Sequence, residues 1–276
     1  MLEDIVSLLN LHGGVLTKKE QIIAKFVIEN QEEIIHMSIT EFSESLNVGE
    51  GTVVRFCQKL GFDGFHSFKI FLAKNTGKDD KKNEDQDDPL GIIRKNHLLT
   101  IEQTSNLLQE TRETVEKCAE IISKCRRLYT IGVGASGATA LDAYYKFMRI
   151  GINTFFSQDT HLIAMELSLA GEKDVVLAFS QSGSTSVIVD LAKIARQNKT
   201  TIISVTGHKR SPLALTSDYV ILTPIREAPF ESGAIRSKIS QLHVLEVLFE
   251  LTKERISKSA QDCITATARA VEKWIY

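Results

Sequence analysis

The chain has 276 residues, of which 43% are hydrophobic and 25% are charged, and its formal net charge is -2 at pH 7. These values are typical of a globular protein with one large and one small domain, and they exclude nucleic-acid binding through overall positive charge. No apolar run approaches the roughly 18 residues of a membrane-spanning helix, and the first residues, MLEDI, lack the basic start of a secretion signal, so we expect a cytoplasmic protein without a membrane partner.

The first third of the chain predicts helices that begin at capping residues. Residues 16–30 carry apolar side chains at helical spacing after Thr17, with Glu20 three positions later, which is the pattern of a capping box. Ser38 and Glu41 repeat this pattern at the start of the next helix. Both segments are therefore expected to form amphipathic helices.

A helix-turn-helix is predicted next in the chain. The turn Asn47-Val48-Gly49 separates the helix that begins at Ser38 from a second helix, which Gly61 ends in the left-handed cap position. In such a motif the second helix lies in the major groove of DNA. The candidate DNA-contacting residues are at the start of the first helix and on the polar face of the second: Ser38, Gly49, Glu50, Thr52, Arg55, Gln58 and Lys59.

Charge leaves a second interpretation open, in which this region is a helical bundle that binds another protein. Over residues 1–75, ten acidic residues outnumber seven basic ones. Between Gly49 and Asn75, however, there are four basic residues and two acidic ones. The positive charge is concentrated where DNA contact is expected.

Four segments between Leu16 and Lys74 carry a family resemblance: LTKKEQIIAKFVIEN, SITEFSESLNV, TVVRFCQKLGF and GFHSFK. In these segments the chain resembles the RpiR family of bacterial transcription regulators. The family usually has Ser and then a small residue such as Ala where this chain has Gly49 and Gly51, so a hydroxyl that could bond a DNA phosphate is absent. The resemblance implies a regulator whose partner is double-stranded operator DNA.

A charged segment predicts the domain boundary. Residues 76–89, TGKDDKKNEDQDDP, contain no aliphatic side chain and have the composition of a solvated linker. We therefore expect a helix-turn-helix domain over residues 1–75, an all-α unit, and a second domain over residues 90–276. Helical periodicity resumes in residues 90–108 and 114–125, and the first of these helices is a candidate for pairing subunits.

The second domain alternates predicted strands with predicted helices. Strands are expected at residues 128–133, 153–157, 174–179, 200–207 and 218–224, and helices between them and from Ser237 onward. Such alternation is typical of a three-layer α/β domain whose five-stranded parallel sheet is covered on both faces. Ligands of such domains bind at the carboxyl ends of the strands.

Two glycine-serine loops follow predicted strands in this domain. SQSGST, residues 180–185, precedes a helix, where backbone N–H groups and the helix dipole attract an anion. GVGASG, residues 132–137, fits G-x-G-x-x-G, so a dinucleotide site with Asp159 as the ribose-binding acid is one alternative. A turn that only caps the following helix is another.

GVGASG, SQSGST and ESGAIRSKISQLHVLEVLF give this region, about residues 122–254, a resemblance to the SIS (sugar isomerase) domain, which binds phosphosugars and pairs into dimers. The resemblance implies that Ser180, Ser182 and Thr185 hold a phosphate, with Ser184 and the backbones of Gln181 and Gly183 beside them. Ser136 and Gly137 would lie along the sugar, and Lys238 stands where the family commonly has Arg. His161, at a predicted helix start, is a further candidate at the pocket rim.

Two functions remain open at this point. The first is a regulator, usually a repressor of a carbohydrate catabolic operon, that acts as a homodimer or homotetramer and responds to a hexose phosphate or an N-acetylated amino-sugar phosphate. The second is a sugar-phosphate isomerase, because Glu231 falls where isomerases of this fold place an acid-base carboxylate. The regulator is preferred, since a DNA-reading motif and a phosphosugar domain share one chain.

Cysteines and histidines provide no signal for a metal. The four cysteines form no C-x-x-C pair, and the seven histidines share no metal-ligand spacing. No metal or other cofactor is therefore expected.

Overall fold

The computed structural model describes residues 5–12, 16–76, 88–224 and 235–274. It divides into two compact units, with the division falling inside a long helix, between Lys95 and Asn96. Among the described residues, no helix combines the length and apolar composition that crossing a bilayer requires.

The first unit is built from helices. They are α1 (Ile5–His12), α2 (Lys18–Glu29), α3 (Gln31–Ile34), α4 (Ile39–Ser45), α5 (Glu50–Lys59) and α6 (Phe65–Thr76). Both predicted capping boxes are present: the Thr17 side chain with Glu20 opens α2, and the Ser38 side chain with Glu41 opens α4. Gly61, which follows the C-cap Leu60 of α5, has the expected positive φ, +89°.

Phenylalanine side chains form the centre of the first unit. Phe42, Phe56 and Phe68 are fully buried, and Phe62 packs on Phe68 with ring centroids 5.4 Å apart. The apolar face of α5 is buried against them, as helical spacing predicted. Burial of this face leaves the opposite, polar face of α5 toward solvent.

The second unit contains a parallel sheet and the remaining helices. Its strands are β1 (Arg127–Ile131), β2 (Thr154–Phe155), β3 (Asp174–Phe179), β4 (Thr201–Thr206) and β5 (Tyr219–Leu222). Its helices are α7 (Pro89–Glu110) from Asn96 onward, α8 (Arg112–Lys124), α9 (Gly134–Arg149), α10 (Thr160–Ser168), α11 (Ser186–Gln197), α12 (Pro212–Thr216), α13 (Ile235–Arg255) and α14 (Ser257–Val271), with a 3₁₀ turn at Glu272–Trp274. The predicted fold class is confirmed.

The strand order is β2-β1-β3-β4-β5, and all neighbours are parallel. The chain adds β2 on one side of β1 and then adds β3, β4 and β5 on the other side. As a result β1 and β3, which are not consecutive in the sequence, lie next to each other. The register pairs Arg127 with Asp174 and Ile131 with Ala178. The carboxyl ends of β1 and β3 therefore meet at the switch point, where ligands bind in open α/β sheets.

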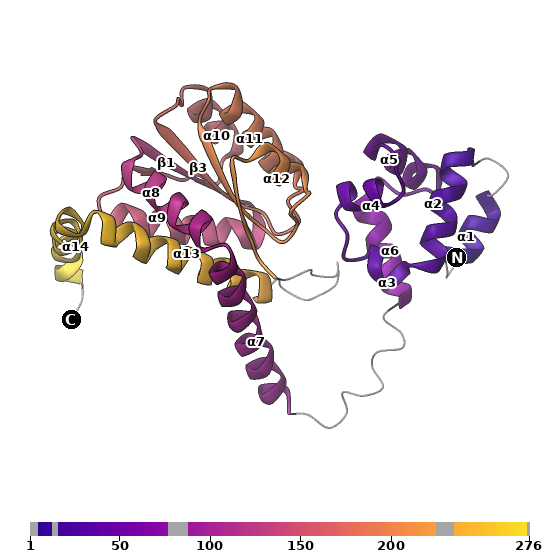
Figure 1. Ribbon diagram of the computed structural model, residues 1–276, viewed down its shortest axis with the longest axis horizontal. Coiled ribbons are helices and arrows are strands. Elements are labelled where there is room, and N and C mark those ends of the chain that lie inside the picture. The colour runs from indigo at the N-terminus through magenta and orange to yellow at the C-terminus, as the bar shows by residue number, and fades with distance from the viewer. Residues whose placement is uncertain (1–4, 13–15, 77–87, 225–234, 275–276) are drawn as a thin grey trace. The chain divides into compact units, whose positions relative to one another are not determined.

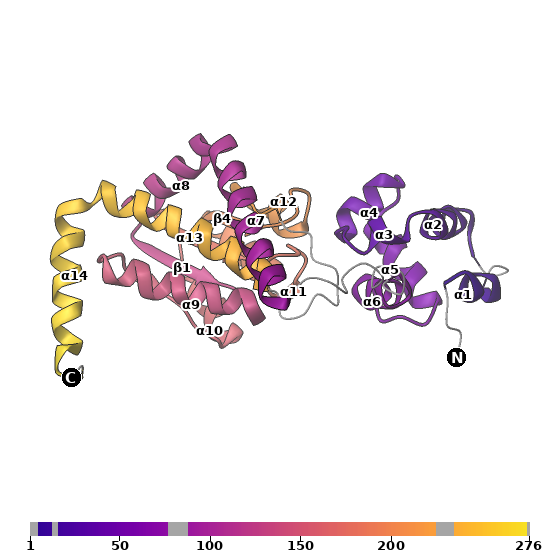
Figure 2. The same cartoon turned by 90° about the horizontal axis from the view of Figure 1, so that it is seen from below.

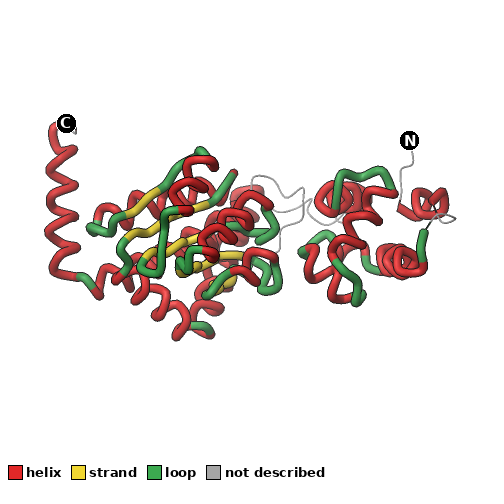
Figure 3. Tube along the Cα trace, turned by 90° about the horizontal axis from the view of Figure 1, so that it is seen from above, coloured by secondary structure: helices red, strands yellow, loops and turns green. Residues whose placement is uncertain are grey.

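Helices cover both faces of the sheet (Figures 1 and 3). One apolar core joins the sheet to α8, α9 and α13, and a second joins it to α10, α11 and α12. The central strand β3 is buried at every position, which explains its continuous apolar sequence. The sequence did not predict α14, which turns steeply away from α13 in Figure 2 and buries Ala260.

Asp174 anchors the start of β3. Its side chain is fully buried and accepts hydrogen bonds from Arg126 Nε at 2.8 Å and from the Gly171 N–H at 2.9 Å. Burial alone would raise the pKa of Asp174, but the bonds from Arg126 and Gly171 outweigh it and hold the pKa below its usual value.

We predict that Asp174→Asn lowers the free energy of unfolding at pH 7 by about 1.5–3 kcal/mol, the range for hydrogen bonds to a charged group. Because the folded pKa is depressed, the contribution is present above the unfolded value, about 3.9, and is lost as pH falls through the folded pKa. Urea unfolding at pH 7 and at acid pH measures this. Asp190→Asn, an exposed partner of Lys193, is the control. Equal stability of wild type and Asp174→Asn at pH 7 would contradict the assignment.

Candidate functional site

The loop after β3 is held against α12 by Gly183. This residue has a φ of +59°, and its carbonyl accepts the Leu213 N–H at 2.9 Å. A Cβ at this position would lie 1.9 Å from Ser211 Oγ, so any larger residue would displace the loop. Glycine is therefore required here both for backbone conformation and for space.

Gln181 fixes the other side of the same loop. Its carbonyl accepts the Gly207 N–H at 2.9 Å and the Thr206 hydroxyl at 3.2 Å. Its side-chain oxygen accepts the Thr223 hydroxyl at 3.1 Å. Gln181 thus ties the loop to the ends of β4 and β5, a task that sequence reasoning did not assign to it.

The hydroxyls of this loop lie at the start of α11. Ser180 is buried and donates to Thr185 Oγ1 at 3.4 Å, while the exposed Ser182 accepts the Ser184 N–H at 3.2 Å. Thr185 is the N-cap of α11 but makes no side-chain capping bond. Its hydroxyl and the positive end of the α11 dipole are therefore placed to meet an anion.

The turn after β1 is the second part of the site. Gly134 has a φ of +58°, and a Cβ on Gly132 would lie 2.6 Å from the Ser136 carbonyl oxygen. Ser136 Oγ accepts a hydrogen bond from Gln241 Nε2 at 3.0 Å. Gln241 belongs to α13 and is 1% exposed. Sequence reasoning missed Gln241, although it lies one helical turn after the candidate Lys238.

The β1–β3 pairing brings the two loops, residues 132–137 and 180–185, to the same edge of the sheet. His161 is exposed in the first turn of α10, after β2, and its backbone N–H donates to Asp159 Oδ1 at 2.9 Å. Lys238 is half-buried in the first turns of α13. Glu231, the candidate carboxylate, lies outside the described residues.

The dinucleotide alternative finds little support in this arrangement. The strand order begins 2-1-3, whereas dinucleotide-binding folds begin 3-2-1. The Asp159 side chain caps α10 by accepting bonds from the backbone N–H groups of His161 and Leu162, so it is already used within its own helix. Within the described ranges, no three His, Cys, Asp or Glu side chains gather as metal ligands.

In the first unit, α4 and α5 form the predicted helix-turn-helix. Asn47 has a φ of +51° in the turn, and Gly49 is the N-cap of α5 without a side-chain capping bond. Arg55 and Gln58 are exposed on α5, and Arg55 Nη2 lies 3.4 Å from the Thr52 hydroxyl. These side chains are available to a nucleic acid.

Three other DNA-contact candidates carry structural contacts in the same unit. Ser38 is buried and caps α4, and the Glu50 carboxylate accepts the Thr40 hydroxyl, which joins α5 to α4. Lys59 Nζ lies 2.6 Å from Glu20 Oε2, which joins α5 to α2. Burial would raise the pKa of Glu20, but the bonds from Lys59 and Thr17 lower it overall.

These features define a class of protein in which a helix-turn-helix unit is joined to an α/β unit with a phosphate-type loop. A family model described as "Helix-turn-helix domain, rpiR family" matches residues 4–79, and one described as "SIS domain" matches residues 121–251. A helix-turn-helix-type transcriptional regulator of Clostridium perfringens is 35% identical over 264 residues, which cover 91% of this chain and 93% of the relative. The regulator HexR of Escherichia coli is 29% identical over 240 residues, covering 84% and 82% of the two chains.

A solved structure is similar over the whole length. It is that of Vibrio vulnificus NanR in complex with ManNAc-6P, with a TM-score of 0.88, 26% identity and 99% of both chains covered. The present chain belongs to the rpiR family of helix-turn-helix transcriptional regulators that carry a SIS domain. The resemblances inferred from the sequence are confirmed, and the two relatives named above, which match most of the chain, are transcriptional regulators.

We predict that Lys59→Ala lowers the stability of the first unit by about 1–3 kcal/mol, because it leaves the buried Glu20 carboxylate without its cationic partner. Denaturant unfolding with a probe in the first unit measures this. Arg55→Ala, at an exposed position of the same helix, should change stability by no more than about 0.5 kcal/mol. If both variants unfold alike, the Glu20–Lys59 pair does not hold α5 in place.

Proposed function

We propose that this protein is a cytoplasmic repressor of a carbohydrate catabolic operon that releases operator DNA when a phosphorylated sugar binds its SIS domain. The effector pocket consists of residues 132–137 and 180–185 with the first turns of α13. In this proposal, residues 1–75 read DNA, residues 76–89 form a linker, and residues 90–276 bind the effector. The observation that carries it is the meeting of two glycine-serine loops at the edge where β1 and β3 end.

A phosphate is the chemistry that the loop after β3 fits best. Gly183 lets the backbone pass close to Ser211, and Thr185 is an N-cap whose hydroxyl is not used for capping. Hydroxyls of Ser180, Ser182 and Ser184 can add further donors to an anion at the α11 N-terminus. Neutral donors of this kind suit binding of a phosphate, with no acid-base catalyst required.

The sugar would extend toward the turn after β1. Ser136 and Gly137 line this side, and Gln241 orients the Ser136 hydroxyl from α13. Lys238 and His161 supply polar groups for ring substituents. NanR, similar over the whole chain, is described in complex with ManNAc-6P, which supports an N-acetylated amino-sugar 6-phosphate or another hexose 6-phosphate as the effector.

DNA recognition would use the exposed face of α5. Arg55 and Gln58 are the side chains placed to reach base edges, with Glu50, Thr52 and Lys59 on the same helix. A homodimer, or a homotetramer made of two dimers, would present paired motifs to half-sites about 34 Å apart, one turn of DNA. A single copy would contact one half-site only.

An operator duplex is first selected from a random-sequence library by its binding to the wild-type protein. We predict that one of a panel of four sugars releases this duplex: ManNAc-6P, GlcNAc-6P, glucose 6-phosphate or fructose 6-phosphate. That sugar should also raise the melting temperature, since a ligand at 100 times its dissociation constant stabilises by about 2.7 kcal/mol. Thr185→Val should weaken its binding about tenfold or more, because a hydrogen bond to a charged group is lost. Calorimetry and fluorescence anisotropy measure the two affinities.

Thr265→Val, on the exposed side of α14, is the matched control and should bind as wild type does. Inorganic phosphate separates recognition of the sugar from recognition of the anion alone. The proposed function is refuted if no duplex is enriched, or if no panel member changes either the melting temperature or DNA binding.

A further inference from the structure

Helix α13 contacts both the effector pocket and α7. Ser240 and Gln241 are consecutive, so their side chains project about 100° apart around the helix. Gln241 donates to Ser136 Oγ at 3.0 Å, and Ser240 Oγ lies 2.8 Å from Thr104 Oγ1 of α7. Ser240 and Thr104 are 0% exposed and Gln241 is 1% exposed. One turn of α13 is therefore bonded both to Ser136 of the pocket and to the buried Thr104 of α7.

The hydroxyl of Thr104 is part of a series of bonds along the buried face of α7. Thr104 Oγ1 donates to the Thr100 carbonyl at 2.6 Å, and Thr100 Oγ1 donates to the Asn96 carbonyl at 2.7 Å. A threonine hydroxyl has a single hydrogen, so Ser240 is the donor in its bond to Thr104. Directional bonds between buried hydroxyls therefore contribute to the contact between the two helices.

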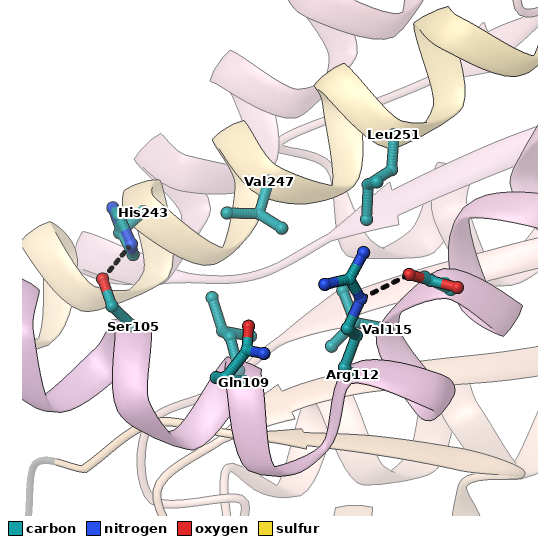
Figure 4. Close-up of a pocket in the computed structure, with 9 residues that line it drawn as sticks. Ser105, Gln109, Arg112, Val115, His243, Val247 and Leu251 are labelled. Atoms are coloured by element: carbon teal, nitrogen blue, oxygen red, sulfur yellow. Dashed lines mark hydrogen bonds and ion pairs between the residues drawn. The ribbon is translucent and has the colours of Figure 1, made fainter.

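A second bond joins the same helices one turn further on. His243 Nε2 lies 2.9 Å from Ser105 Oγ, and Figure 4 shows the two side chains facing each other across the helices. Beyond them, a groove of about 220 Å³ separates α13 from the α7–α8 junction, with Val247 and Leu251 on one side and Val115 on the other. The two hydrogen bonds therefore join α13 to α7 directly beside a stretch where a groove separates the helices.

We propose that α13 transmits occupancy of the effector pocket to α7 through the Ser240–Thr104 and His243–Ser105 hydrogen bonds. This inference rests on the proposed function and names its route of regulation. A sugar that bonds Ser136 competes for the hydroxyl that Gln241 holds, and a shift of Gln241 moves Ser240 because both belong to one helical turn.

The buried bond makes that movement directional. If Ser240 moved without Thr104, a buried hydroxyl would lose its acceptor, which is less favourable than carrying Thr104 along. Helix α7 begins at Pro89 and is the first described element after α6. A shift of α7 therefore moves the point at which the DNA-reading region is tethered.

The test uses the full-length protein with Thr104→Val and Ser240→Ala combined. Replacing both partners by apolar groups of similar shape is close to neutral for stability, so the variant should fold. Three quantities are measured: the affinity for the panel sugar that is active on wild type, the affinity for the selected duplex with and without that sugar, and the melting temperature. Thr252→Val is the matched control, a fully buried threonine of α13 whose hydroxyl bonds the Leu248 carbonyl within the same helix.

We expect the double variant to bind the sugar alone, and the duplex alone, with affinities within about threefold of wild type. In allosteric proteins an effector commonly changes affinity by about 5–150-fold. In the double variant the sugar-induced fall in DNA affinity should shrink to less than about twofold. Each single variant should lose response in the same direction, which provides a second test. Thr252→Val should respond as wild type does. A double variant that retains the full wild-type fall overturns the inference. A wild-type protein that binds no sugar or no duplex overturns the proposed function instead.

Discussion

The pairing of β1 with β3 is the constraint on which the α/β unit depends. Parallel hydrogen bonding in the register Arg127–Asp174 to Ile131–Ala178 aligns the two strands, so the loops that follow them begin at the same level of the sheet. Each loop is then shaped locally, the first by Gly132 and Gly134 and the second by Gly183. The proposed pocket depends on this alignment, because in the proposal one loop would hold the phosphate and the other would supply a hydroxyl to the sugar.

In the helix-turn-helix unit, two carboxylates join α5 to neighbouring helices. Glu20 caps α2 by accepting bonds from Thr17 and at the same time holds Lys59 near the end of α5. At the other end of α5, Glu50 accepts a bond from Thr40. Two carboxylates thus fix both ends of the helix that would read DNA, and this leaves Arg55 and Gln58 on its exposed face.

Local features of the sequence were sufficient to predict most of this architecture. The capping boxes, the apolar strand Asp174–Phe179 and the glycine turns are each determined within a few residues of chain, and the alternation of strands and helices indicated a parallel sheet. The loop at residues 180–185 was predicted to bind an anion for the same reason, since a strand, a serine turn and a helix follow one another directly.

Contacts between distant residues were not predictable in this way. The partner of Lys59 is 39 residues away, and Gln241 is 105 residues from Ser136. Nothing in the pattern around Thr104 indicates that it meets Ser240, because a threonine at helical spacing looks the same whether it packs or bonds. Helix α14 was also missed, since its weakly apolar sequence buries Ala260 and few other side chains.

Hydrogen–deuterium exchange of the full-length protein, with and without the active sugar phosphate, tests the central claim most directly. The account predicts slower exchange in residues 132–138 and 180–187, where the effector would bind, together with altered exchange in residues 100–108 and 237–244, where α7 and α13 meet. Sugar binding that leaves both loops unchanged and protects another part of the chain would contradict it.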